Sequence, residues 1–120
     1  MLGGTDMWPG NWESDEEEVQ ALLERWQGSM AEAWAYTVSH GQFLLRLHRQ
    51  SERSLFVWFK SCRSVQFAPS WQESNVKLEN NPGGILLATD GGNLNVSCTS
   101  IHVAETEGYD VEPLFGSFKD

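Results

Sequence analysis

The residues of this chain that could bind a metal ion or act as nucleophiles are few. They are His40, His48, His102, Cys62 and Cys98. No two of them have the spacing of a zinc-binding pair, and no two histidines are four residues apart as on one helix face. On one extended strand His40 and His48 would lie about 26 Å apart, at about 3.3 Å per residue. We therefore expect no metal site and no bound cofactor.

Cys62 is the strongest candidate for a nucleophile, because Arg63 follows it and a neighbouring cation lowers the pKa of a thiol. A catalytic cysteine also needs a base and oxyanion donors, and no glycine-rich turn surrounds Cys62. We expect Cys62 and Cys98 to be buried, free thiols in a reducing compartment. A disulfide between them would require neighbouring strands, since the two Cα atoms must lie within about 7 Å.

The glycine-rich turns do not predict a phosphate or calcium site. Gly83-Gly84 and Gly91-Gly92 lack the lysine and the following helix of a phosphate-binding loop. Residues 90–95 lack the alternating acids and distal glutamate of a calcium loop. Residues 90–92 instead predict a hairpin turn. The absence of a catalytic constellation favours a protein without enzymatic activity.

A basic and aromatic cluster between residues 46 and 63 is the remaining candidate for a ligand site. Arg46 and His48 alternate with apolar residues and so share one face of a predicted strand, and Trp58 joins them if the next strand pairs with it. Either this is an outer sheet face covered by the acidic tail, or it binds an anionic ligand or protein. A ligand pocket would also need Trp34. The basic members of the cluster are Arg46, His48, Arg49, Arg53, Lys60 and Arg63.

The net charge of −9 is concentrated at the two ends of the chain. Residues 1–32 carry −7, residues 33–104 carry +2 and residues 105–120 carry −4. Acidic ends repel phosphate backbones, so we expect no nucleic-acid binding. They favour the encounter with a basic protein. The partner contacts that we expect are Trp8, Trp12, Glu16, Glu17, Glu18 and Phe118.

Two alternatives to these partner contacts stay open at this stage. Trp8 and Trp12 either contact a partner or fold back onto the domain, because both rings are costly to leave in water. A homodimer, joined by a sheet edge or by the aromatic termini, is the other alternative.

One helix is predicted near the N-terminus, at about residues 15–27. Ser14 and Glu17 have the spacing of a capping box, and Gly28 suits the helix end. The apolar stripe of this helix is Val19, Leu22, Leu23 and Trp26.

Alternating apolar residues predict the strands that follow. In 32–39, Trp34, Tyr36 and Val38 would share one face, although alanines 31, 33 and 35 leave a helix as an alternative. Strand 54–60 is apolar on both faces, so we place it centrally, under the helix. A bulge near residues 98–100 would explain a change of apolar phase. The predicted strands are 32–39, 42–49, 54–60, 64–68, 75–79, 85–89 and 93–103.

The sequence thus predicts an α+β fold, with one N-terminal helix packed on a mostly antiparallel, five- to seven-stranded twisted sheet. Residues 1–120 form one domain, with an irregular arm at 1–13 and an acidic, aromatic tail at 105–120. The chain has no apolar run near the roughly 18 residues of a membrane span and no signal peptide, so we expect a cytoplasmic protein. Its expected function is a small acidic interaction module, such as an inhibitor or immunity-like binder of a basic protein. The alternative is a small-ligand-binding or cryptic enzymatic domain that uses a concave sheet face.

Overall fold

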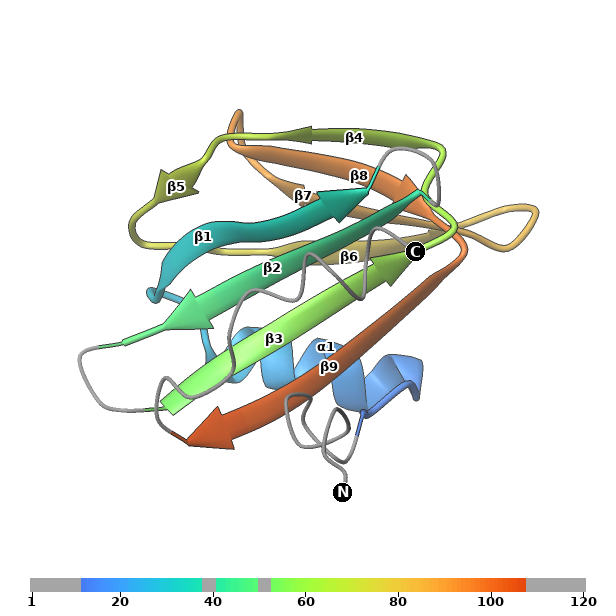
Figure 1. Cartoon of the computed structure of the whole chain (residues 1–120). Helices are drawn as coiled ribbons and strands as arrows, with labels where there is room; N and C mark the ends of the chain where they lie inside the picture. The colour runs from blue at the N-terminus through green and yellow to red at the C-terminus, as the bar shows by residue number, and fades with distance from the viewer. Residues whose placement is uncertain (1–11, 38–40, 50–52, 108–120) are drawn as a thin grey trace, which may run out of the picture.

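Two antiparallel sheets make up most of the structure, a computed structural model that describes residues 12–37, 41–49 and 53–107. One sheet has the strand order β5-β1-β2-β3-β9 and the other β4-β8-β7-β6 (Figure 1). The described elements are α1 (Glu16–Arg25), β1 (Met30–Thr37), β2 (Gln42–His48), β3 (Arg53–Lys60), β4 (Ser64–Phe67), β5 (Ser70–Trp71), β6 (Lys77–Asn81), β7 (Ile85–Asp90), β8 (Leu94–Cys98) and β9 (Ser100–Glu107). The α+β class and the antiparallel pairing are confirmed, but the single sheet that we expected is two sheets.

The described chain passes between the two sheets four times, at β3–β4, β4–β5, β5–β6 and β8–β9, and two of these crossings lie side by side. One crossing joins β3 to β4, and the other joins β8 to β9 through Thr99. Thr99 N donates to Lys60 O at 3.3 Å, and Arg63 N donates to Ser97 O at 2.7 Å. The change of apolar phase near residue 99 is therefore a passage from one sheet to the other, and not the bulge that the sequence suggested.

The main core lies between the sheets, where the alternating apolar residues of the sequence face one another. Phe43 on β2 stacks on Phe59 of β3, with ring centroids 5.6 Å apart. The largest fully buried side chains of this core are Phe43, Phe59, Leu45, Leu47, Leu55, Leu94, Val19, Val57, Val96 and Val103. The period-two pattern thus identified the inward face of the principal strands.

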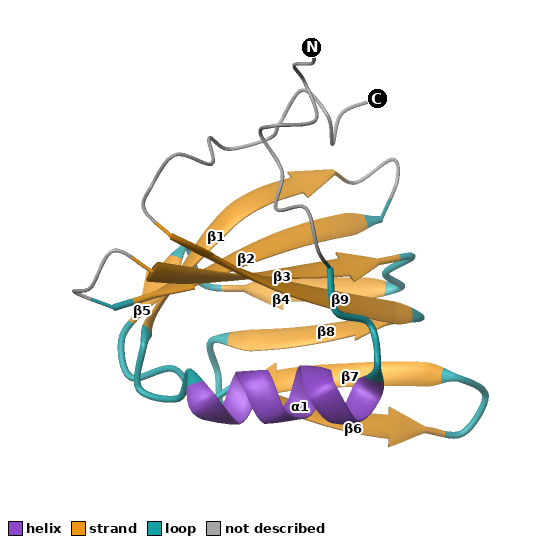
Figure 2. Ribbon diagram, turned by 90° about the horizontal axis from the view of Figure 1, so that it is seen from below, coloured by secondary structure: helices purple, strands orange, loops and turns teal. Residues whose placement is uncertain are grey.

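α1 contacts β9 of one sheet and β6 of the other, which are edge strands of their sheets (Figure 2). Val19, Leu23 and Trp26 are buried in the main core, so the predicted apolar stripe is confirmed. β3 is an interior strand, paired with β2 and β9, as expected for a strand that is apolar on both faces, while the main contacts of α1 are with the edge strands. Among the described residues, no helix is long and apolar enough to cross a membrane.

The N-cap of α1 is Asp15, whose Oδ2 accepts a hydrogen bond from Glu18 N at 3.2 Å. The predicted cap, Ser14, instead hydrogen-bonds to His102. Just before the helix, Glu13 forms a β-bridge to Val103 through two backbone hydrogen bonds of 2.7 and 2.9 Å. The start of the helix is therefore attached to β9 by two neighbouring residues, Glu13 through its backbone and Ser14 through its side chain.

A bulge in β1 separates Trp34 from Tyr36. Ala33 pairs with Leu45 and Ala35 with Leu44, so Trp34 is the additional residue. The strand interpretation of this segment is confirmed over the helical one. The prediction that Trp34 and Tyr36 share one face of the strand is wrong. Their ring contacts show that Tyr36 packs toward the main core and that Trp34 lies on the opposite face. Val38 lies outside the described residues.

The two predicted glycine turns form as expected, and a short strand that precedes both of them in the sequence was missed. Gly91, at φ +56°, lies in the turn between β7 and β8, and Gly83 and Gly84, with φ of +85° and +79°, lie between β6 and β7. The unpredicted strand is β5, whose Trp71 donates from Nε1 to the Asp90 carboxylate at 2.8 Å. This bond ties the β7–β8 turn to the first sheet.

Candidate functional site

Arg46, His48 and Trp58 lie on one face of the five-stranded sheet, as their alternation with apolar residues required. β2 pairs with β3 so that Arg46 is opposite Phe56 and Leu44 is opposite Trp58. We call the side of this sheet that faces away from the main core the outer face. Its described side chains include Trp12, Glu32, Trp34, Leu44, Arg46, His48, Ser54, Phe56, Trp58 and His102.

A buried ionic centre occupies this outer face. Arg46 Nη1 lies 3.0 Å from Glu32 Oε1, its Nε donates to Ser54 Oγ at 3.1 Å, and its guanidinium is 4.8 Å from the ring centroid of Trp34. His48 Nε2 lies 3.1 Å from the same Glu32 oxygen. Burial, together with the charge of Arg46, lowers the pKa of His48 below its usual value, and Glu32 partly opposes this. Arg46 is therefore the permanent cation of this centre.

Aromatic rings surround Trp58 beside the ionic centre. The Trp12 ring lies 5.2 Å from that of Trp58, and the His102 ring lies 5.9 Å from it. Trp58 Nε1 donates to Gln42 Oε1 at 2.9 Å, and Lys60 Nζ is 4.7 Å from its ring centroid. Of the two alternatives for Trp12, contact with the domain itself is the one the structure shows.

The centre of the outer face is closely packed, although its composition is that of a ligand site. Leu44 is fully buried, Phe56 is 2% exposed, and the Arg46 side chain is 7% exposed. A ligand that used Arg46 would have to open this packing, whereas Trp58 is partly exposed. Of the other predicted contacts, Trp8 and Phe118 lie outside the described residues.

Ser14 and His102 form a pair that sequence reasoning missed. Ser14 Oγ hydrogen-bonds to His102 Nδ1, and His102 Nε2 lies 3.3 Å from Ser100 Oγ. Burial and the charge of Lys60 lower the pKa of His102. The pair lines a small cavity of about 140 Å³ next to the start of α1. Ser14 and His102 are 88 positions apart, so no local pattern could have brought them together.

The Ser14–His102 pair lacks part of a serine nucleophile's machinery. In a catalytic triad a carboxylate orients the histidine, whereas here the second ring nitrogen faces a serine hydroxyl. The cavity is also smaller than the roughly 300–1,000 Å³ of typical ligand sites. Among the described residues, no group of three or more His, Cys, Asp or Glu side chains could hold a metal ion.

The glutamates of α1 form an exposed acidic surface, which we call the acidic helix face. Its members are Glu16, Glu17, Glu18 and Glu24. Glu16 accepts a hydrogen bond from Asn80 Nδ2 at 3.0 Å. None of the four carboxylates forms an ion pair with a described cation. This surface therefore keeps its negative charge unneutralised by the part of the chain that the structure describes.

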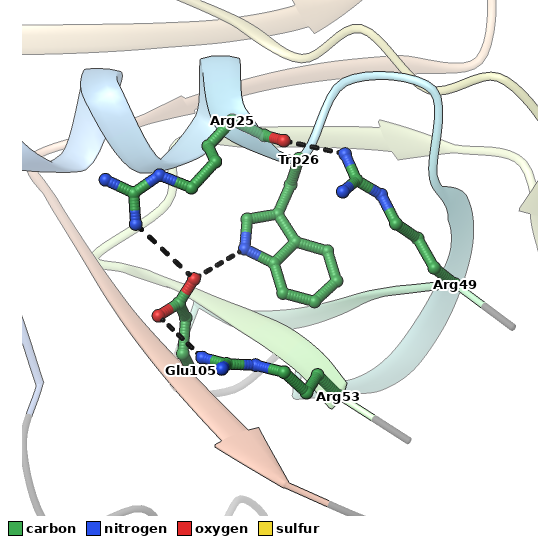
Figure 3. A network of polar contacts seen from close by, with 5 residues as sticks. All are labelled: Arg25, Trp26, Arg49, Arg53 and Glu105. Carbon is green, nitrogen blue, oxygen red and sulfur yellow. Dashed lines mark hydrogen bonds and ion pairs between the residues drawn. The ribbon is translucent and has the colours of Figure 1, made fainter. Parts of the chain in front are cut away.

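At the other end of α1, two arginines converge on Glu105 (Figure 3). Arg53 Nη2 lies 3.1 Å from Glu105 Oε1, and Arg25 Nη1 lies 3.9 Å from Oε2. Trp26 Nε1 donates to Glu105 Oε2 at 2.8 Å. Glu105 thus joins the helix, β3 and β9.

Arg49 binds the C-terminal end of α1. Its Nη2 donates to Arg25 O at 2.6 Å and Gln27 O at 3.0 Å, and its Nε donates to Ser29 Oγ at 3.0 Å. The guanidinium also lies 5.1 Å from the ring centroid of Trp26. A cation is favourable here, because the carbonyl end of a helix carries partial negative charge.

The basic cluster of the sequence is therefore divided among separate places. Arg46 belongs to the outer face, Arg49 to the end of α1, Arg53 to Glu105, and Lys60 to Trp58. Arg63 is exposed at the start of β4. These residues do not form a single basic patch within the described chain, and most of the acidic tail that was expected to cover such a patch, residues 108–120, lies outside the described residues.

A surface groove runs beside the acidic helix face, between α1 and β6. Its volume is about 340 Å³. Its apolar floor includes Val76 and Leu78, both nearly buried. Gln20, Gln27, Glu24 and Glu79 add polar and acidic groups to its lining, and Lys77 adds one cation. This groove combines apolar surface with two carboxylates and one lysine at one place.

A comparison of the chain with protein-family models, with curated proteins and with solved structures finds no match. The function must therefore be argued from the geometry of the chain itself.

Proposed function

We propose that this chain is a non-catalytic interaction module that binds a basic protein, as an inhibitor or immunity-like protein does, through the acidic helix face and the groove beside it. One observation carries the proposal. The four exposed glutamates of α1 have no cationic partner among the described residues, while most described arginines are engaged within the fold. An outward field of this kind speeds the encounter with a cationic surface.

The groove supports the same proposal, because it suits a long basic side chain. The methylene groups of a lysine or arginine can cover Val76 and Leu78 while the charged end reaches Glu24 or Glu79. Arginine is also common among the residues that contribute most to interface affinity. Glu24 lies on both the acidic helix face and the groove, so one partner could use both.

The test compares two triple variants of Glu16, Glu17 and Glu18, once a partner has been captured with the wild-type protein from its native host. Replacing all three by Gln removes three charges, and the association rate should fall several-fold at low salt, with little change in dissociation. Replacing all three by Asp keeps the charges and serves as the matched control. The rate for the wild type should fall as salt rises, because the Debye length shrinks from about 10 Å at 0.1 M to about 3 Å at 1 M.

Equal association rates for the Gln and Asp variants would count against the acidic helix face as the binding surface. A thermal melt of each variant is needed beside the kinetics, since acids in the first turn stabilise a helix by about 0.3–1 kcal/mol each. The proposal is supported if the Gln variant associates slowly but has the same melting temperature as the wild type.

A second candidate is a small-ligand or hydrolytic site at Ser14 and His102, supported by their hydrogen bond and the cavity that they line. An activated ester is the probe. If this candidate is right, Ser14→Ala abolishes turnover and Ser100→Ala only reduces it. Turnover that is the same in wild type and Ser14→Ala eliminates it.

A further inference from the structure

The two cysteines of the chain, Cys62 and Cys98, come together where the chain crosses between the sheets. Cys62 lies in the crossing from β3 to β4, and Cys98 ends β8 just before the crossing to β9. The hydrogen bonds from Thr99 N to Lys60 O and from Arg63 N to Ser97 O hold the two crossings together on either side of the cysteines. Both are free thiols, and Cys62 packs against the core cluster that contains Cys98.

The two thiols differ in accessibility and in acidity. Cys98 is fully buried, whereas Cys62 is only partly buried, which corrects the expectation that both are buried. A hydrogen bond from Cys98 lowers the pKa of Cys62, against the opposing effect of its burial. The same hydrogen bond and burial raise the pKa of Cys98. An external reagent therefore meets Cys62 first, and in its more reactive form.

We propose that Cys62 and Cys98 form a reversible intramolecular disulfide by exchange with a low-molecular-weight disulfide of the glutathione type. The Cys62 thiolate attacks one sulfur of the reagent, forms a mixed disulfide, and releases one thiolate, which takes up a proton. The Cys98 thiol then loses its proton to solvent and attacks the Cys62 sulfur, which releases the second thiolate. The protein loses two electrons and two protons, and the reagent is reduced to two thiols.

The structure supports both steps of this exchange. Conversion of Cys62 to a mixed disulfide removes the hydrogen bond and the negative charge that raise the pKa of Cys98, so the second thiol becomes more reactive after the first step. Cys62 N donates to Gly41 O at 2.8 Å, so the crossing that carries Cys62 is also held from the side of β2. The product covalently links the β3–β4 crossing to the end of β8, next to the β8–β9 crossing.

The experiment exposes the folded protein to oxidised glutathione and follows its intact mass. Wild type should lose two hydrogens and carry no glutathione, and dithiothreitol should reverse this. Cys98→Ser should accumulate a glutathione adduct at Cys62, whereas Cys62→Ser should stay unmodified because Cys98 is buried. The oxidised wild type should melt roughly 10 °C higher than the reduced one, as expected for a link across about 36 residues.

Three outcomes would overturn the proposal: a stable glutathione adduct on wild type, a disulfide-linked dimer on a non-reducing gel, or no reaction at all. Far-ultraviolet circular dichroism of each variant shows whether it is folded. The mass change and the melting shift of the wild type need no variant, so a serine variant that does not fold leaves the test intact.

Discussion

Glu105 lies at the junction of α1, β3 and β9. Replacing it by Gln or by Ala should distinguish the contribution of its hydrogen bond to stability from that of its two ion pairs. The Glu105 side chain is 24% exposed, while its partners Arg53 and Arg25 are 51% and 66% exposed. Solvent screens such pairs, so the closer one, to Arg53, contributes about 0.2–1 kcal/mol and the one to Arg25, at 3.9 Å, almost nothing. The hydrogen bond from Trp26 Nε1 is less screened by solvent than these ion pairs, because Trp26 is only 4% exposed.

The two substitutions therefore predict two different losses of stability. Glu105→Gln keeps an acceptor for Trp26 and should lower the free energy of unfolding by roughly 0.5–1 kcal/mol. Glu105→Ala also leaves a buried indole N–H without its partner, which adds about 1–3 kcal/mol. Urea unfolding followed by tryptophan fluorescence measures both. Equal losses for the Gln and Ala variants, or a difference that high salt removes, would show that the Trp26 hydrogen bond does not contribute as stated.

Other predictions concern the core, the histidines and one glycine. Leu23→Ala should cost about 2–5 kcal/mol in a urea melt, since Leu23 is buried in the main core; a loss below 1 kcal/mol would mean that α1 is not packed as described. The folded-state pKa values of His48 and His102 are lowered from 6.5, so the unfolded chain takes up protons first and stability should fall as pH drops below about 6.5. A His102→Gln variant should lose part of this pH dependence, and an unchanged profile would exclude His102 as a source. Gly41→Ala should cost more than Gly84→Ala in the same melt, because both glycines have positive φ but only at Gly41 would a Cβ meet a backbone atom, Cys62 O at 3.1 Å; equal losses would refute the crowding.

The strands and the helix could be predicted from the sequence because apolar residues recur with the period of a strand or a helix on the face that meets the main core. Phe43, Leu45 and Leu47 alternate with residues of the other face, and this spacing survives in the structure. The division into two sheets could not be predicted. The alternation of apolar residues is interrupted at Thr99 in the same way whether one strand contains a bulge there or the chain passes to the other sheet. The bulge at Trp34 is likewise set by pairing with β2 and not by local spacing.

Only part of the candidate sites could be predicted from the sequence. Arg46 and His48 could be placed on one face because they are two positions apart on a single strand. The partners of Arg49 and Arg53 could not be found, because Trp26 and Glu105 are distant in the sequence and meet these arginines only through the fold. The proximity of Cys62 and Cys98 could not be predicted either, because it depends on the two crossings being neighbours in the fold.

The position of β9 has a consequence for the order in which the chain folds. β9 pairs with β3 along its length, contacts α1 and bridges to Glu13, so the helix at the start of the described chain rests on its last strand. During synthesis α1 has no β9 to dock on until residues 100–107 have left the ribosome. Contacts of such long sequence separation slow folding into roughly the millisecond-to-second range. Stopped-flow refolding followed by the fluorescence of Trp26 should show a slow phase of this order, and burial of Trp26 within microseconds would contradict it.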